Sequence, residues 1–138
     1  MRMRRLALLT ICAFALVPAF AVASAAGNKG VVDSSWISQT SGGTRLTNIK
    51  AAQVKKLYAN FVWKTPAKAG QVLAIEWRDP SNQLRARWKD KTLKNDKKGT
   101  RLYAWIGPGV VKGHPGTWSA VLLVGNSKIG QTKFKIGK

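Results

Sequence analysis

The sequence has very few of the side chains that bind soft metals or form disulfides. It contains one cysteine, Cys12, one histidine, His114, and two methionines, Met1 and Met3. Soft-metal sites need cysteine, methionine or clustered histidine as ligands. A lone cysteine cannot close a disulfide within the chain. We therefore expect a protein without a metal, a cofactor or an internal disulfide.

Carboxylates are also scarce, with five Asp and Glu residues in the chain. Asp79 belongs to a turn. Glu76, on the strand before that turn, is expected to form an ion pair with Arg78 or Arg87. His114 lies in a turn without a neighbouring serine, cysteine or acid that could complete a catalytic triad. The sequence patterns of nucleophile elbows, phosphate-binding loops and dinucleotide-binding folds are absent. These absences predict a protein that is not an enzyme.

A long apolar run occurs only near the N-terminus. Residues 1–5 contain three arginines, residues 6–22 are almost wholly apolar, and small residues follow at positions 23–25. This order is typical of a signal peptide that is cleaved after export. The alternative is an uncleaved membrane anchor, because the run is near the lower limit for spanning a bilayer. We expect residues 1–25 to be removed and residues 26–138 to form one domain that is periplasmic or secreted.

Positive charge dominates the composition. The chain has 24 Lys and Arg residues and a net charge of +19, which falls to +16 without the three arginines of the signal segment. A small domain with this charge attracts polyanions. The expected partners are anionic polysaccharide, lipopolysaccharide or another polyanion, and alternatively another exported protein. Nucleic acid ranks below these because only charge points to it. A charge that serves solubility alone is the competing interpretation.

Alternating apolar residues predict seven short strands, bounded by glycine, proline and asparagine. The predicted strands are residues 31–38, 56–64, 72–77, 84–89, 102–106, 118–124 and 129–136. Residues 44–54 fit this pattern poorly, and Thr47 or Asn48 is expected to cap a short helix through residues 51–53. The fold class is therefore all-β, with two antiparallel sheets stacked as a sandwich. By the same alternation, most of the six tryptophans belong to the core.

Residues 71–107 organise the predicted fold. The turn Asp-Pro-Ser-Asn at residues 79–82 joins two strands, because proline presets φ and asparagine tolerates irregular dihedrals. Leu84, Ala86 and Trp88 are expected to face the core on the second strand. The basic residues between them would then share the opposite face.

A run of basic residues followed by two aromatic residues is the candidate binding site. Its members are Arg85, Arg87, Lys89, Lys91, Lys94, Lys97, Lys98, Arg101, Tyr103 and Trp105. The first four recur at every second position, so on an extended strand they would form one row with a spacing of roughly 7 Å. Such a row could follow a polyanion, while the aromatic rings stack on sugars or bases. The alternative is a solvated strand whose charges protect a sheet edge.

Short motifs in the second half of the chain resemble bacterial exported immunoglobulin-like domains. These motifs are WRDPSN at residues 77–82, PGTW at residues 115–118, and NSKI followed by FKI near the C-terminus. The resemblance covers roughly residues 61–138. It implies an immunoglobulin-like sandwich of about seven strands and says little about a ligand. The cysteine pair of antibody-type domains is missing, so the resemblance concerns architecture alone.

Overall fold

The computed structural model describes residues 29–90 and 97–138. The predicted signal segment 1–25 and the basic residues Lys91 and Lys94 therefore lie outside the described residues. Within them the chain forms strands, a 3-10 turn η1 (Ala51–Gln53) and a short helix α2 (Pro108–Val111). The strands are β1 (Val31–Ser38), β2 (Asn48–Lys50), β3 (Leu57–Thr65), β4 (Leu73–Arg78), β5 (Leu84–Asp90), β6 (Arg101–Ile106), β7 (Gly116–Val124) and β8 (Ser127–Gly137).

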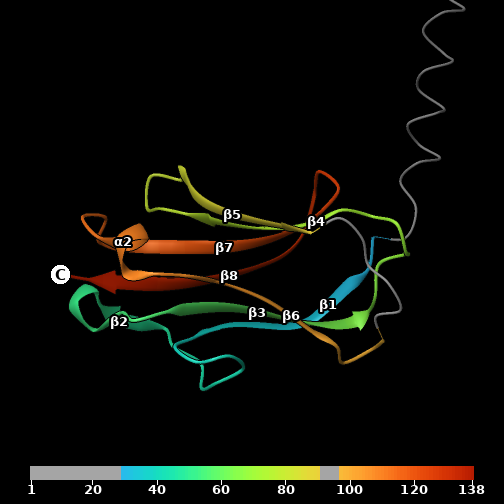
Figure 1. Ribbon diagram of the computed structural model, residues 1–138, viewed down its shortest axis with the longest axis horizontal. Helices are drawn as coiled ribbons and strands as arrows, with labels where there is room; N and C mark the ends of the chain where they lie inside the picture. The colour runs from blue at the N-terminus through green and yellow to red at the C-terminus, as the bar shows by residue number, and fades with distance from the viewer. Residues whose placement is uncertain (1–28, 91–96) are drawn as a thin grey trace, which may run out of the picture.

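The strands form two stacked sheets, as Figure 1 shows. One sheet has the order β1-β3-β6, and the other has the order β2-β8-β7-β4-β5. Every pairing is antiparallel except that of β2 with β8. The all-β two-sheet sandwich predicted from alternation is therefore confirmed. The described part of the chain contains one strand more than the seven predicted.

The additional strand is β2, in the segment where a helix was predicted. Ile49 is buried and lies opposite Ile136 of β8, so β2 adds a short edge to the larger sheet. Helix is limited to the three residues of η1, none of which is buried. A helical turn is therefore present at the residues predicted, but it is a single 3-10 turn that follows Lys50, and Asn48 belongs to β2 and caps no helix.

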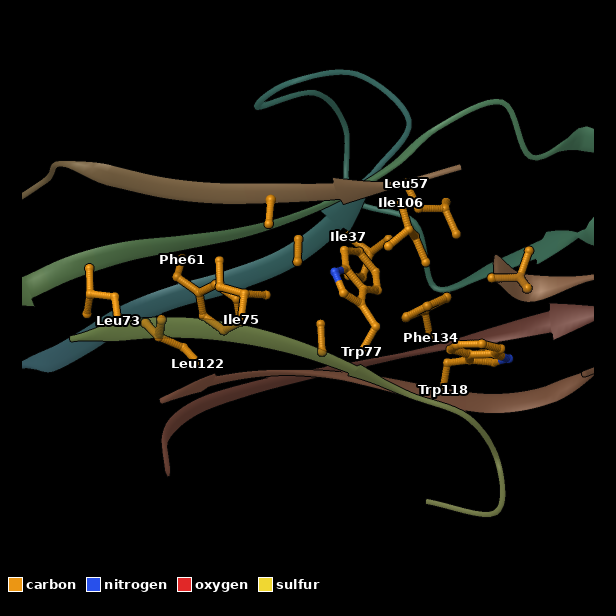
Figure 2. Packing of buried hydrophobic residues seen from close by; sticks show 14 of the residues in the cluster. Ile37, Leu57, Phe61, Leu73, Ile75, Trp77, Ile106, Trp118, Leu122 and Phe134 are labelled. Carbon is orange, nitrogen blue, oxygen red and sulfur yellow. The ribbon is translucent and has the colours of Figure 1, made fainter. Parts of the chain in front are cut away.

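Large side chains from both sheets fill the space between the layers (Figure 2). Trp63, Trp77 and Trp118 are fully buried. The Trp77 ring meets the edge of Phe134 at a centroid distance of 6.0 Å, and Trp118 stacks on the same ring at 6.3 Å. Trp105 differs, because it points outward and is 52% exposed. Three of the six tryptophans are therefore in the core and a fourth, Trp88, packs against it, which confirms that most of them are core residues.

The β4–β5 hairpin contains the predicted turn. Asn82 has φ of 64°, in the left-handed region that asparagine tolerates, and its N–H donates to the carbonyl of Asp79. The register shifts beyond the turn: Trp77 lies opposite Ala86 and Arg78 opposite Leu84. This bulge transfers Leu84 from the core side to the outer side. Leu84 is 46% exposed, so the prediction that it faces the core is wrong, whereas Ala86 and Trp88 pack against the core.

Candidate functional site

A basic face covers the outer side of the five-stranded sheet. Leu73, Ile75 and Trp77 are buried in the core, so the residues between them on β4 point away from it. Glu76 lies opposite Arg87 and Ala74 opposite Lys89, which places both cations on the same outer side. The neighbouring strands β7 and β8 extend this face. We define the basic face by its cations, which are Arg78, Arg87, Lys89, Lys133 and Lys135.

The lysines of β8 lie on the same face, because β7 pairs with both β4 and β8. Lys133 and Arg78 both lie opposite Ser119, one from each neighbouring strand. Because adjacent strands are about 4.8 Å apart, the backbones of Lys133 and Arg78 are about 10 Å apart. Lys135 follows one pleat along β8, and both lysines are exposed. The basic face therefore spans β5, β4, β7 and β8.

The basic face has little negative charge of its own. Among the described strand residues on it, Glu76 is the only acid, and it is 6% exposed. Arg78 Nη2 lies 3.0 Å from Glu76 Oε2, which confirms one of the two partners predicted for Glu76. Arg87, Lys89, Lys133 and Lys135 have exposed side chains. The face thus presents an excess of cations to solvent.

The residues of the predicted binding site do not form one continuous face. Arg87 and Lys89 lie on β5 in the five-stranded sheet, whereas Arg101, Tyr103 and Trp105 lie on β6 in the three-stranded sheet. Lys97 and Lys98 belong to the turn before β6 and are exposed. The sequence prediction missed this division because alternation gives the facing of a side chain within a strand, not the sheet that holds the strand.

The Arg85 side chain contacts the turn of the β4–β5 hairpin and does not continue the row of Arg87 and Lys89. It is the extra residue of the bulge, and its Nε donates to Asp79 Oδ2 at 2.7 Å. The other carboxylate oxygen, Asp79 Oδ1, accepts the N–H groups of Ser81 and Gln83 at 2.8 and 2.9 Å. The carboxylate therefore closes the turn and holds Arg85 beside it.

This network makes folding stability depend on Asp79 ionisation. The backbone N–H of Gln83, together with Arg85 and the N–H of Ser81, lowers the pKa of Asp79, against an opposing effect of burial. A folded-state pKa below the unfolded value of about 4 stabilises the fold at higher pH. That contribution should disappear as pH falls below about 4 and through the folded pKa.

The substitution Asp79→Asn should therefore lower the free energy of unfolding at neutral pH and have a smaller effect in acid. Urea unfolding of both proteins at pH 7 and at about pH 2.5 measures the difference in their free energies of unfolding at each pH. The same difference at both pH values would show that the charge of Asp79 contributes nothing to stability.

Arg101 belongs to a network on the outer side of the three-stranded sheet. Its Nη1 donates to Asn60 Oδ1 at 2.7 Å and its Nη2 to Ser41 Oγ at 2.9 Å. The guanidinium also lies 4.7 Å from the Tyr103 ring centroid. Lys56 Nζ lies 4.3 Å from the ring centroid of Trp105. Each exposed aromatic ring of β6 therefore contacts a cation of the protein itself.

A cleft of about 630 Å³ lies between the edge strands β5 and β6. This volume is within the range of ligand-binding pockets, roughly 300–1,000 Å³. Apolar and aromatic side chains form most of its wall, with two arginines and one acid. The lining residues are Trp77, Ala86, Arg87, Trp88, Asp90, Arg101, Leu102, Tyr103, Ala104, Trp105 and Ile106. The cleft thus brings together four of the predicted site residues, Arg87, Arg101, Tyr103 and Trp105.

Two further observations concern the described residues alone. No group of three or more His, Cys, Asp and Glu side chains lies close enough together there to hold a metal ion. None of the helices in that part of the chain has the length and hydropathy needed to cross a bilayer.

The sequence analysis missed the contribution of β8 to the basic face. Lys133 and Lys135 alternate with the buried residues Phe134 and Thr132, a signal that does mark them as outward. Nothing in the local pattern indicates that β8 lies two strands away from β4. The register of β7 with both strands supplies that information.

Comparison with known proteins extends the description of the fold. No family model and no curated protein sequence matches the chain. An immunoglobulin-like protein from Pseudomonas aeruginosa has a TM-score of 0.54 at 12% identity, over 80% of this chain and 98% of that protein. β-Glucosidase 3B from Thermotoga neapolitana has a TM-score of 0.50 at 13% identity. That match covers 81% of this chain but 16% of the glucosidase. Identities this low show the fold alone, and that fold is immunoglobulin-like.

Proposed function

We propose that this protein is an exported, non-enzymatic binding module whose basic face binds an anionic polymer of the cell envelope. The observation that carries the proposal is the concentration of cations on the outer side of the five-stranded sheet. Four of the five cations of the basic face are exposed, and the acid among them is buried and paired with Arg78. The immunoglobulin-like fold is compatible with a binding role and does not select the ligand.

The spacing of the cations suits an extended polyanion. Arg87 and Lys89 are about 7 Å apart along β5, and Lys133 and Lys135 have the same spacing on β8. The two pairs are separated by β7 and β4, so a polymer that crosses the strands would contact both. Polysaccharides with regularly placed carboxylate, sulfate or phosphate groups meet this requirement. Export is part of the proposal and depends on the signal sequence predicted at residues 1–25.

Binding to heparin, a sulfated polysaccharide, tests the basic face. The triple substitution Arg87→Glu, Lys133→Glu and Lys135→Glu should weaken binding about tenfold or more near physiological salt. It should also reduce the slope of log affinity against log salt by roughly three, because three cations no longer displace counterions. Titrations at several salt concentrations give both quantities.

A matched control separates the site from net charge. Lys64, Lys68 and Lys112 are exposed and lie outside the basic face, on the other sheet or in loops. Their reversal to glutamate changes the net charge by the same amount. Heparin affinity and salt slope that fall equally in the two triple variants would contradict a localised site and favour a charge that serves solubility.

A further inference from the structure

The two sides of the sandwich are closed to different degrees. On one side β1 contacts β8, and a bridge between Ile37 and Leu46 ties the following loop to the sheet. On the other side, the edge strands β5 and β6 border the cleft. Within the described residues, β5 pairs with β4 alone and β6 with β3 alone. Two edge strands therefore border one cleft.

The two edges are protected differently. The β5 edge carries Arg85, Arg87 and Lys89, the kind of charge that natural sheets use against strand addition. Between Leu102 and Ile106, β6 contains no charged residue and no proline. Its outward side chains are instead Tyr103 and Trp105, which are 46% and 52% exposed. Of the two, β6 is the edge that an incoming strand can approach.

The far edge of β6 has no neighbouring strand in the described chain. The smaller sheet has three strands in the order β1-β3-β6, so β6 lies at its edge. A fourth strand would lie about 4.8 Å from β6, on the side of the cleft. Its inward side chains would meet Trp88, Leu102 and Ile106.

We infer that β6 accepts an extended segment of a partner protein as a fourth strand, by β-strand addition over the cleft. The segment has apolar residues at alternate positions, which fill the cleft, and acidic residues between them. The acidic character follows from charge: the side chains between the apolar ones would point to the outer side of the smaller sheet, where Arg101 and Lys56 lie beside the rings of Tyr103 and Trp105. A second copy of this chain would bring a second large positive charge and would be repelled. This inference does not depend on the basic face.

A peptide probe tests the inference directly. The probe is an acetylated octapeptide of alternating valine and acidic residues, Val-Asp-Val-Glu-Val-Asp-Val-Glu. Its controls are a peptide of the same composition with all four valines first and an alternating valine–lysine peptide. We expect saturable binding of the alternating acidic peptide, at least tenfold tighter than either control. Amide hydrogen exchange at alternate β6 residues should slow at least tenfold in the complex, because added-strand pairing protects those amides.

Two variants locate the peptide. Ala86→Phe fills the cleft from β5 and should weaken peptide binding about tenfold, whereas Trp105→Ala removes an exposed neighbour of the new strand and should weaken it about threefold. The double variant Lys133→Glu and Lys135→Glu, on β8 away from the cleft, should keep its peptide affinity within about twofold while it loses heparin affinity, so failure of the two proposals can be told apart.

Three results would overturn the inference. The first is no binding of the alternating peptide up to about 1 mM. The second is equal binding of the peptide with all valines first, which would indicate charge attraction alone. The third is protection of β6 amides in the free chain that grows with protein concentration, which would identify a second copy as the occupant.

Discussion

Replacing Trp77 with alanine should lower the free energy of unfolding by about 3–5 kcal/mol. Trp77 is 1% exposed, lies between the sheets on the interior strand β4, and packs edge-to-face with Phe134. Its removal leaves a cavity at the point where the core reaches the cleft. Domains of this size are stable by about 5–15 kcal/mol, so the variant should lose a large part of its stability. Urea unfolding at neutral pH measures the difference.

Trp105→Ala is the matched control for this prediction. The same side chain is deleted, but Trp105 is 52% exposed on the outer side of β6 and contacts Lys56. Its loss should cost less than about 1 kcal/mol, in keeping with an exposed cation–π pair. A loss at Trp105 as large as that at Trp77 would contradict the assignment of the core.

Asn60→Ala should lower the free energy of unfolding by about 2–3 kcal/mol. Asn60 is fully buried on β3 although its side chain faces away from the core between the sheets. Its Nδ2 donates to Ser38 Oγ at 2.9 Å, and its Oδ1 accepts from Gly42 N at 3.2 Å and from Arg101 Nη1 at 2.7 Å. Alanine removes these hydrogen bonds, and the fully buried Ser38 hydroxyl keeps only its bond to the Thr40 carbonyl. Several hydrogen bonds of about 1 kcal/mol each account for the expected loss.

Ser41→Ala provides the control for Asn60. It removes another acceptor of Arg101, but that hydrogen bond is exposed and water can replace it. The expected loss is less than about 0.5 kcal/mol. If Asn60→Ala unfolded at the same urea concentration as Ser41→Ala, the buried network around Asn60 would not stabilise the sheet.

Much of the fold follows from alternation over five or more residues. β1 begins and ends where the sequence predicts, because valines, tryptophan and isoleucine recur between breakers at both ends. The turn at residues 79–82 follows from proline and asparagine chemistry. β2 could not be predicted in this way, since a single inward residue, Ile49, gives no period. Its partner β8 is also distant in the sequence.

The candidate site was harder to predict than the fold. Alternation identifies Arg87, Lys89, Lys133 and Lys135 as outward, and the structure places them on one sheet. It cannot reveal that Arg101 lies on the other sheet, because the sheet of a strand depends on contacts between distant residues. It also cannot reveal the bulge that ties Arg85 to Asp79, since bulges depend on the register of the pair.

The most direct test of the basic face is an NMR titration of the isotope-labelled protein with a short heparin oligosaccharide. Binding at the basic face predicts that the largest amide shifts occur at Arg87, Lys89, Lys133 and Lys135. The amides of Lys64, Lys68 and Lys112 should shift little at the same saturation. Shifts spread evenly over both groups, or confined to the three-stranded sheet, would contradict the proposed function.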